Sequence, residues 1–150
     1  MLPFFDDTWV QRLIKEIKTT DALIMASFVA DNDEVFAALL DRFGAHRPFF
    51  CEVLVDKKHH GLRTCRSQAL KLKRLKAAGA QVYLCKGRNG RGVMHRKEFV
   101  LDAKVLYEGS ANASNAMSHN EDGMTRMTGH PVASFLANMR RVRDRGELLR

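Results

Sequence analysis

The side chains best suited to chemistry lie in two short segments of the chain. His95 and Lys97 are two residues apart, so in an extended segment both project from the same face. Gly109 permits close approach of the backbone, and Ser110 and Asn112 add neutral hydrogen-bond donors. An imidazole, an ammonium and an amide that converge suit a tetrahedral phosphate, because they stabilise charge on its non-bridging oxygens as phosphorus becomes five-coordinate. The pattern predicts a site for phosphoryl chemistry.

The spacing of these residues is specific. The run from His95 to Asp102 reads HRKEFVLD, and after six further residues the run from Gly109 to Asn112 reads GSAN. Together they match HxK(x)4D(x)6GSxN at every fixed position, and in this the sequence resembles the phospholipase D superfamily. The order of elements is similar to that of its small single-motif members, the bacterial non-specific endonuclease and the Zucchini-type mitochondrial nucleases. The resemblance is close over about residues 95–121 and architectural elsewhere.

The resemblance implies a role for each residue of the motif. His95 would attack phosphorus to give a phosphohistidine intermediate, and a second His95 would protonate the leaving oxygen. Lys97 and Asn112 would hold the phosphate oxygens, and Ser110 would support the phosphate pocket. Asp102 would stabilise the local turn and its hydrogen-bond network.

The small nucleases of this superfamily also use a Glu beyond the GSxN segment to orient the histidine. Glu121 is the best match, nine residues after Asn112. Because that gap looks about two residues shorter than in the relatives, the adjacent Asp122 stays an alternative. The position after Asn112 is often aromatic in the relatives but is Ala113 here, so we expect a stacking contact at the pocket to be missing. Ser114 keeps the hydroxyl that commonly follows.

The positive charge is concentrated in one part of the chain. The protein has 150 residues and a formal net charge of +8. The segment 57–97, called the basic segment below, holds 13 Lys and Arg and no Asp or Glu. The rest of the chain, with 12 basic against 17 acidic residues, carries −5. Such a segment attracts polyanions and releases counterions when it follows a phosphate backbone, although a solvated helix face and, for residues 86–92, a solvated turn stay open as alternatives.

We expect several residues in and near the basic segment to contact substrate. These are Lys57, Lys58, Arg88, Arg91, Arg96, Gly109 and Ser114. His59 and His60 match no position of the motif, and we expect them to extend a phosphate-contacting rim rather than to bind a metal.

The elements that must position these residues alternate along the chain. Apolar spacing and end signals predict helices over 8–18, 31–43 and 64–78 and a last helix from 131. Short apolar runs predict strands over 22–30, 49–56, 81–85, 97–101, 105–107 and 124–128. The alternation indicates an α/β fold, with a mixed, largely parallel sheet flanked by helices. No linker or repeat interrupts it, so we expect one phospholipase D-like domain over residues 1–150.

The mechanism needs two imidazoles, but the chain contains one copy of the motif. In-line displacement requires a nucleophile on one side of phosphorus and an acid on the other. The simplest solution, which the resemblance also implies, is a two-fold homodimer in which both copies of His95 meet at the axis. We expect no metal and no cofactor, since Lys97 and Asn112 supply the electrostatics that a divalent ion would otherwise provide.

The leading hypothesis is an enzyme, a metal-independent phosphodiesterase acting as an endonuclease on DNA, RNA or both, with single strands favoured. The alternative is a phospholipase D-type hydrolase of phosphatidyl lipids such as cardiolipin, because anionic lipid would also be attracted to the basic segment. The third is a catalytically silent nucleic-acid-binding module. The sequence specifies neither the preferred strand and base nor the biological role.

The amino-acid composition limits the classes of protein to which this chain can belong. With 45% hydrophobic and 28% charged residues the chain can bury a core, and no apolar run approaches the roughly 20 residues of a membrane span. The start of the chain lacks the features of a secretory signal or an Arg-rich transit peptide. The three cysteines suggest neither a disulfide framework nor a zinc site. We therefore expect a cytoplasmic protein without stable membrane insertion.

Overall fold

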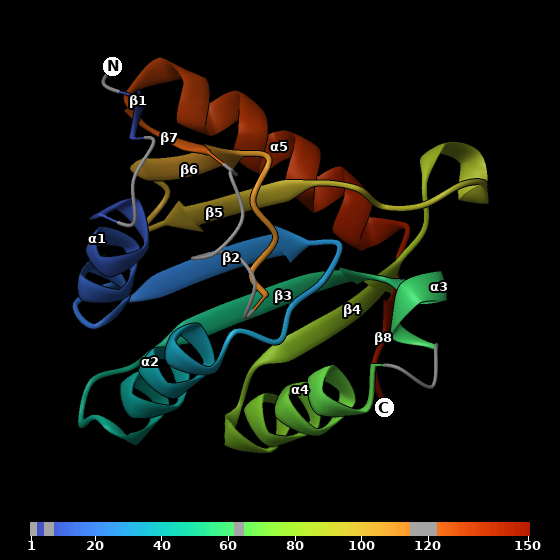
Figure 1. Cartoon of the computed structure of the whole chain (residues 1–150), viewed down its shortest axis with the longest axis horizontal. Coiled ribbons are helices and arrows are strands. Elements are labelled where there is room, and N and C mark those ends of the chain that lie inside the picture. The colour runs from blue at the N-terminus through green and yellow to red at the C-terminus, as the bar shows by residue number, and fades with distance from the viewer. Residues whose placement is uncertain (1–2, 5–7, 62–64, 115–122) are drawn as a thin grey trace.

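The computed structural model describes residues 3–4, 8–61, 65–114 and 123–150. Its centre is an eight-stranded sheet with the order β1-β7-β6-β5-β2-β3-β4-β8 (Figure 1). The strands are β1 (Pro3–Phe4), β2 (Ala22–Ser27), β3 (Phe50–Asp56), β4 (Gln81–Cys85), β5 (Lys97–Leu101), β6 (Val105–Gly109), β7 (Met124–Thr128) and β8 (Glu147–Leu148). The α-helices are α1 (Thr8–Ile17), α2 (Asp33–Gly44), α3 (Lys57–His60), α4 (Arg66–Ala78) and α5 (His130–Asp144), and η2 (Arg88–Gly90) is a 3₁₀ turn.

The predicted mixed α/β architecture is confirmed, but the expectation of a largely parallel sheet is wrong. Among the described strands, β2 pairs in parallel with β3 and β3 with β4, whereas the other five pairings are antiparallel. The parallel strands are joined through α2 and α4, which supply the long crossovers that parallel pairing requires. β5 and β6 are joined by residues 102–104 alone, and so short a connection produces a hairpin.

Helices cover both faces of the sheet. α1, α2 and α4 lie on one face and α5 crosses the other (Figure 1). Side chains alternate along each strand, so Met25 and Phe99 join the core under α1 and α2, whereas Ile24 and Val100 join the smaller core under α5. Burial on both faces explains why the strands are continuous apolar runs in the sequence.

The predicted elements are present, with ends that shift by a few residues. The strands over 81–85, 97–101 and 124–128 have the predicted bounds. The strand expected over 22–30 ends at Ser27, and the strand expected over 105–107 continues to Gly109. The sequence analysis did not predict β1, β8, α3 or η2. Within the described ranges, no helix combines the length and the apolar character needed to cross a membrane.

The topology brings one end of several strands together. β2 and β3 run in parallel, so their carboxyl ends lie at the same edge of the sheet. β5 runs antiparallel to β2, with Lys97 opposite Ser27, so its first residue lies at that edge too. The start of β2 and the end of β5 lie at the opposite edge, where Asp102 follows Leu101.

Candidate active site

His95 and Lys97 meet where β5 begins. His95 is exposed, while the Lys97 side chain is buried against the sheet and only 8% of the residue is accessible. Lys97 Nζ lies 3.0 Å from His95 Nδ1 and 3.2 Å from His95 Nε2, and it donates to the His95 carbonyl at 2.9 Å. The predicted pairing of an imidazole with a fixed ammonium is therefore present in the structure.

Asn112 reaches the same edge of the sheet through contacts with the end of β2. Asn112 Oδ1 accepts a hydrogen bond from the Val29 N–H at 3.3 Å and lies 3.5 Å from Ser27 Oγ. Ser27 Oγ also accepts from the Ala113 N–H at 2.9 Å. Since Ser27 lies opposite Lys97 in the sheet, the imidazole, the ammonium and the amide gather around one strand end. Ser27, which joins the two halves of the motif, is not among the site residues predicted from the sequence.

Gly109 and Ser110 hold the segment that carries Asn112. A Cβ atom on Gly109 would lie 2.1 Å from the Gly123 carbonyl oxygen, so only glycine allows the backbones to approach this closely. Ser110 Oγ accepts from the Gly123 N–H at 3.0 Å, and the Ser110 N–H donates to the Gly123 carbonyl at 2.9 Å. The Ser110 hydroxyl is thus engaged in backbone contacts that support this part of the site.

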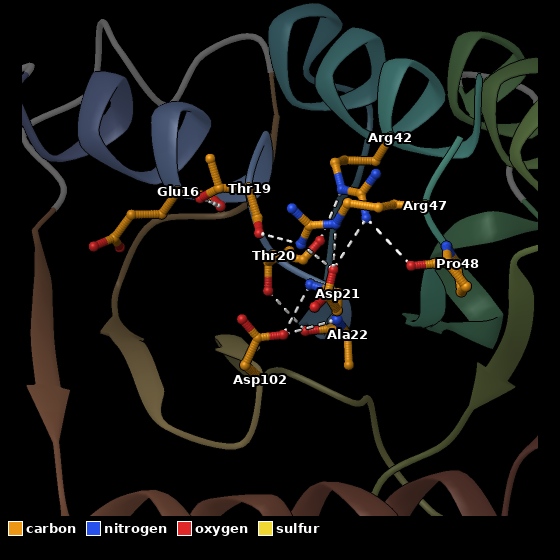
Figure 2. A network of polar contacts seen from close by, with 9 residues as sticks. All are labelled: Glu16, Thr19, Thr20, Asp21, Ala22, Arg42, Arg47, Pro48 and Asp102. Atoms are coloured by element: carbon orange, nitrogen blue, oxygen red, sulfur yellow. Dashed lines mark hydrogen bonds and ion pairs between the residues drawn. The ribbon is translucent and has the colours of Figure 1, made fainter. Parts of the chain in front are cut away.

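Asp102 lies at the other end of β5, away from His95. Its Oδ1 accepts from the N–H groups of Asp21 and Ala22, both at 2.9 Å, and its φ of +51° forms part of the tight turn (Figure 2). Burial opposes ionisation, but the Asp21 and Ala22 N–H donors, together with Thr20 and Lys104, lower the pKa of the Asp102 carboxyl. The structure therefore places Asp102 as expected for a residue that stabilises the turn.

A network of charged side chains surrounds that turn. Arg42 donates to the Thr20 carbonyl at 2.7 Å, and Arg47 donates to the Asp21 carboxylate and to the Thr19 carbonyl (Figure 2). The network ties α2 and the following loop to the start of β2.

Phe28 and Asp56 support His95, and the sequence analysis missed both. The Phe28 ring lies between two imidazoles, with its centroid 5.2 Å from that of His95 and 4.7 Å from that of His59. Buried Asp56 accepts from the Met94 N–H at 2.7 Å and from the His59 N–H at 2.8 Å. An aromatic contact with the histidine is therefore present, although Ala113 suggested that it would be missing. Phe28 and Asp56 lie at the carboxyl ends of two adjacent parallel strands, β2 and β3. That position is the feature by which both could have been found from the sequence.

A pocket of about 430 Å³, called the side pocket below, opens beside His95 on the face of the sheet covered by α5. Three of the residues expected to bind substrate, Arg88, Arg96 and Gly109, line it together with His95 and Lys97. The remaining lining residues are Lys86, Gly87, Val93, Met94, Glu98, Glu108, Val142 and Arg145. Cationic side chains therefore lie next to the imidazole.

The other expected substrate contacts lie outside this lining. Lys57 forms an ion pair with Glu147, and Lys58 and Arg91 are exposed. The Ser114 carbonyl accepts from the side chain of Asn32 at 3.1 Å. These residues stay predicted contacts of a wider substrate-binding surface. Glu121 and Asp122, the alternatives for the residue that orients the histidine, lie outside the described residues.

Comparison with known protein families gives a match that covers most of the chain. A family described as cardiolipin synthase, PLD-like domain, matches residues 10–141. No curated protein matches the sequence.

Solved structures share the fold at low sequence identity. Nuc, a phospholipase D family member from Salmonella typhimurium, superposes with a TM-score of 0.81 at 15% identity, covering 94% of this chain and 90% of that one. NucT from Helicobacter pylori superposes with a TM-score of 0.77 at 17% identity, covering 93% and 90%. Phosphatidylserine synthase from Haemophilus influenzae Rd KW20 gives a TM-score of 0.68 at 13% identity, covering 95% of this chain and 37% of that protein.

Proposed function

Because this chain belongs to the phospholipase D superfamily, we propose that it is a metal-independent endonuclease that cleaves DNA or RNA, preferentially as single strands. The family match and the fold support phosphodiester chemistry of the phospholipase D type. The observation that carries the proposal is the convergence of His95, Lys97 and Asn112 around the end of β2.

The geometry suggests a two-step reaction. A ring nitrogen of His95 attacks phosphorus, so an N–P bond forms while the bond from phosphorus to the leaving ester oxygen breaks. The leaving oxygen takes a proton from a second imidazole, which then removes a proton from the water that cleaves the phosphohistidine. Lys97 and Asn112 stabilise the charge on the non-bridging oxygens, and Phe28 holds the attacking ring in place.

The second imidazole comes from a second copy of the chain in our proposal. His95 is exposed where β5 begins, so the same residue of a partner can approach it across a two-fold axis. We therefore propose an obligate homodimer that is fully active in the presence of a chelator. A protein that is monomeric by light scattering and fully active in a cleavage assay would contradict this. Activity that requires added Mg²⁺ would contradict it too.

Charge favours nucleic acid as the substrate. Lys86, Arg88, Arg96 and Arg145 line the side pocket next to His95. Further Lys and Arg side chains of the basic segment are exposed on α3, α4 and the loop before β5, namely Lys58, Arg66, Lys73, Arg74, Lys76 and Arg91. Where a nucleic-acid strand contacts several of these cations, they would neutralise its phosphates, so its binding should weaken steeply as salt rises.

A lipid phosphodiester is the second candidate. The description of the matching family names cardiolipin synthase, and the same cationic groups would attract an anionic headgroup. Cardiolipin in vesicles is the substrate that tests this alternative.

The cytoplasmic location expected from the sequence also stays a prediction.

The deciding experiment compares substrates in EDTA. Purified protein and a His95→Ala control are incubated with labelled single-stranded DNA, RNA, duplex DNA and cardiolipin vesicles. We expect His95-dependent cleavage of the single strands. Lipid turnover without nucleic-acid cleavage would reject the proposal, and salt-sensitive binding without turnover of any substrate would favour a silent binding module.

A further inference from the structure

The side pocket contains two carboxylates that the proposed reaction does not use. Glu98 on β5 and Glu108 on β6 are direct partners in the sheet register, so both side chains project from the same face. Both line the side pocket beside His95. Like charges directly opposite one another destabilise a sheet, so the pair indicates a function other than stability.

Glu98 is buried and only partly satisfied. It is 5% exposed, and its Oε1 accepts from Arg96 Nη1 at 2.7 Å. Its Oε2 has no hydrogen-bond partner among the described residues. Burial raises the pKa of this carboxyl against the opposing effect of Arg96, and Glu108 raises it further. A buried acceptor without a donor is unfavourable, so a ligand that supplies a donor would be stabilised here.

A metal ion is a poor match for this pair. Among the described residues, no group of three or more His, Cys, Asp or Glu is arranged to hold one. An N–H donor suits the site better, since a carboxylate accepts hydrogen bonds through both oxygens. The terminal torsion of Glu is broad, so Oε2 can turn toward a ligand in the pocket.

The remaining walls of the pocket favour a nucleotide. Val93 is exposed and provides apolar surface for the face of a base, while Met94 and Val142 are buried in the core beneath the pocket. Lys86, Arg88 and Arg145 are exposed cations on the same wall, suited to a flanking phosphate. His95 and Lys97 are among the residues that line the pocket at the start of β5, so we place the bound base in a nucleotide next to the reacting phosphodiester.

We propose that the side pocket is a base-recognition subsite, in which Glu98 and Glu108 accept hydrogen bonds from the exocyclic amine of the nucleobase adjacent to the scissile phosphate. Cytosine is the preferred base, because its N4 amine pairs well with a carboxylate, whereas uracil and thymine present a carbonyl oxygen there. This inference rests on the proposed nuclease function and adds base selectivity to it.

The test compares two oligonucleotides that differ at a single base next to the cleavage position. One has cytosine there and the other has uracil. We expect the wild-type protein to cleave beside cytosine about tenfold faster, in line with the discrimination that one well-formed polar contact gives. In Glu98→Gln, which can donate as well as accept, the ratio of the two rates should fall toward one. Glu34→Gln removes an exposed carboxylate on α2 and is the matched control, with the wild-type ratio.

Binding to the His95→Ala protein provides a second measurement that does not need turnover. The His95→Ala protein should bind the cytosine oligonucleotide more tightly than the uracil oligonucleotide. Adding Glu98→Gln to it should remove this difference in affinity. Cleavage of both oligonucleotides at equal rates by the wild type, or a ratio unchanged in Glu98→Gln, would overturn the subsite and leave the nuclease proposal intact. Absence of any nucleic-acid cleavage would overturn both, as would turnover of an amine-bearing lipid alone.

Discussion

Asp56 and Asp102 each accept two backbone N–H bonds, but they do so at opposite ends of the sheet and in different surroundings. Asp56 is 1% exposed and joins the Met94 N–H to the His59 N–H at the end where His95 lies. Asp102 is exposed and joins its own turn to the start of β2. The first carboxylate holds the backbone next to His95, the proposed nucleophile, whereas the second ties the β5–β6 turn to the start of β2 at the opposite end of the sheet.

The comparison separates two kinds of residue within the motif. His95 and Lys97 contact each other, and Asn112 contacts Ser27 opposite Lys97, all at the end of the sheet where Asp56 lies. Asp102, which the same motif specifies, lies across the length of β5 from them. Residues of one sequence pattern therefore lie at opposite ends of the sheet, and we propose that those beside His95 serve the chemistry and that Asp102 serves the fold. Substitutions at His95, Asp56 and Asp102 test this distinction.

His95→Ala should have the largest effect, and on turnover alone. Loss of the nucleophile should lower the rate of phosphodiester cleavage at least about a thousandfold. Because the side chain is exposed, the free energy of unfolding should change by no more than about 0.5 kcal/mol. A cleavage assay and urea denaturation measure the two quantities. A mutant that keeps a tenth of the activity would remove His95 from its proposed role.

Asp56→Ala should affect both stability and activity. The substitution leaves the buried Met94 N–H without an acceptor, which should lower the free energy of unfolding by about 3 kcal/mol. The backbone before His95 also loses its anchor, so the rate of cleavage per folded molecule should fall as well. Denaturant titration and active-site titration under native conditions measure these effects, with Asp41→Ala on the exposed face of α2 as the control. Full activity in the folded mutant would show that Asp56 does not position His95.

Asp102→Ala should affect stability alone, and less strongly. Loss of the two hydrogen bonds to an exposed carboxylate should cost about 1.5 kcal/mol, at the low end for charged acceptors because solvent screens the group. Asp102→Asn should recover part of this, since Asn tolerates the positive φ of the turn and keeps one acceptor. Turnover per folded molecule should stay within tenfold of wild type in both. A larger loss would place Asp102 in the chemistry.

The smallest effect is the pH dependence of the Asp102 contribution. The pKa of Asp102 is lowered in the folded protein, so its stabilising effect is fully present above the unfolded pKa of about 4 and is lost as the pH falls through the lower, folded value. The difference in free energy of unfolding between wild type and Asp102→Asn should therefore be constant from pH 7 to 5 and shrink below pH 4. Urea denaturation at each pH measures it. A difference that grows as the pH falls would have the wrong sign.

Much of the fold could be predicted because each strand and helix carries its own pattern. Strands buried on both faces are apolar throughout, and the helix α2 begins after Asn32, whose side chain caps it by accepting from the Val35 N–H at 2.9 Å. The two-residue strands β1 and β8 have no pattern of their own, because pairing with a neighbouring strand is what makes them strands. The direction of pairing was mispredicted, because short apolar runs look alike in parallel and antiparallel sheets.

The sequence by itself determined the motif and the chemistry it favours, because HxK(x)4D and GSxN place fixed residue types at short separations along the chain. Only the tertiary structure decided which of those residues meet, since the contacts of Asn112 with Ser27 and Val29 and of Asp56 with Met94 join segments far apart in sequence. The same holds for Phe28 against His95 and for the facing pair Glu98 and Glu108, which depend on strand register. The spacing of residues along the chain is fixed by the sequence, whereas the register of the strands and the burial of side chains arise only when the sheet assembles.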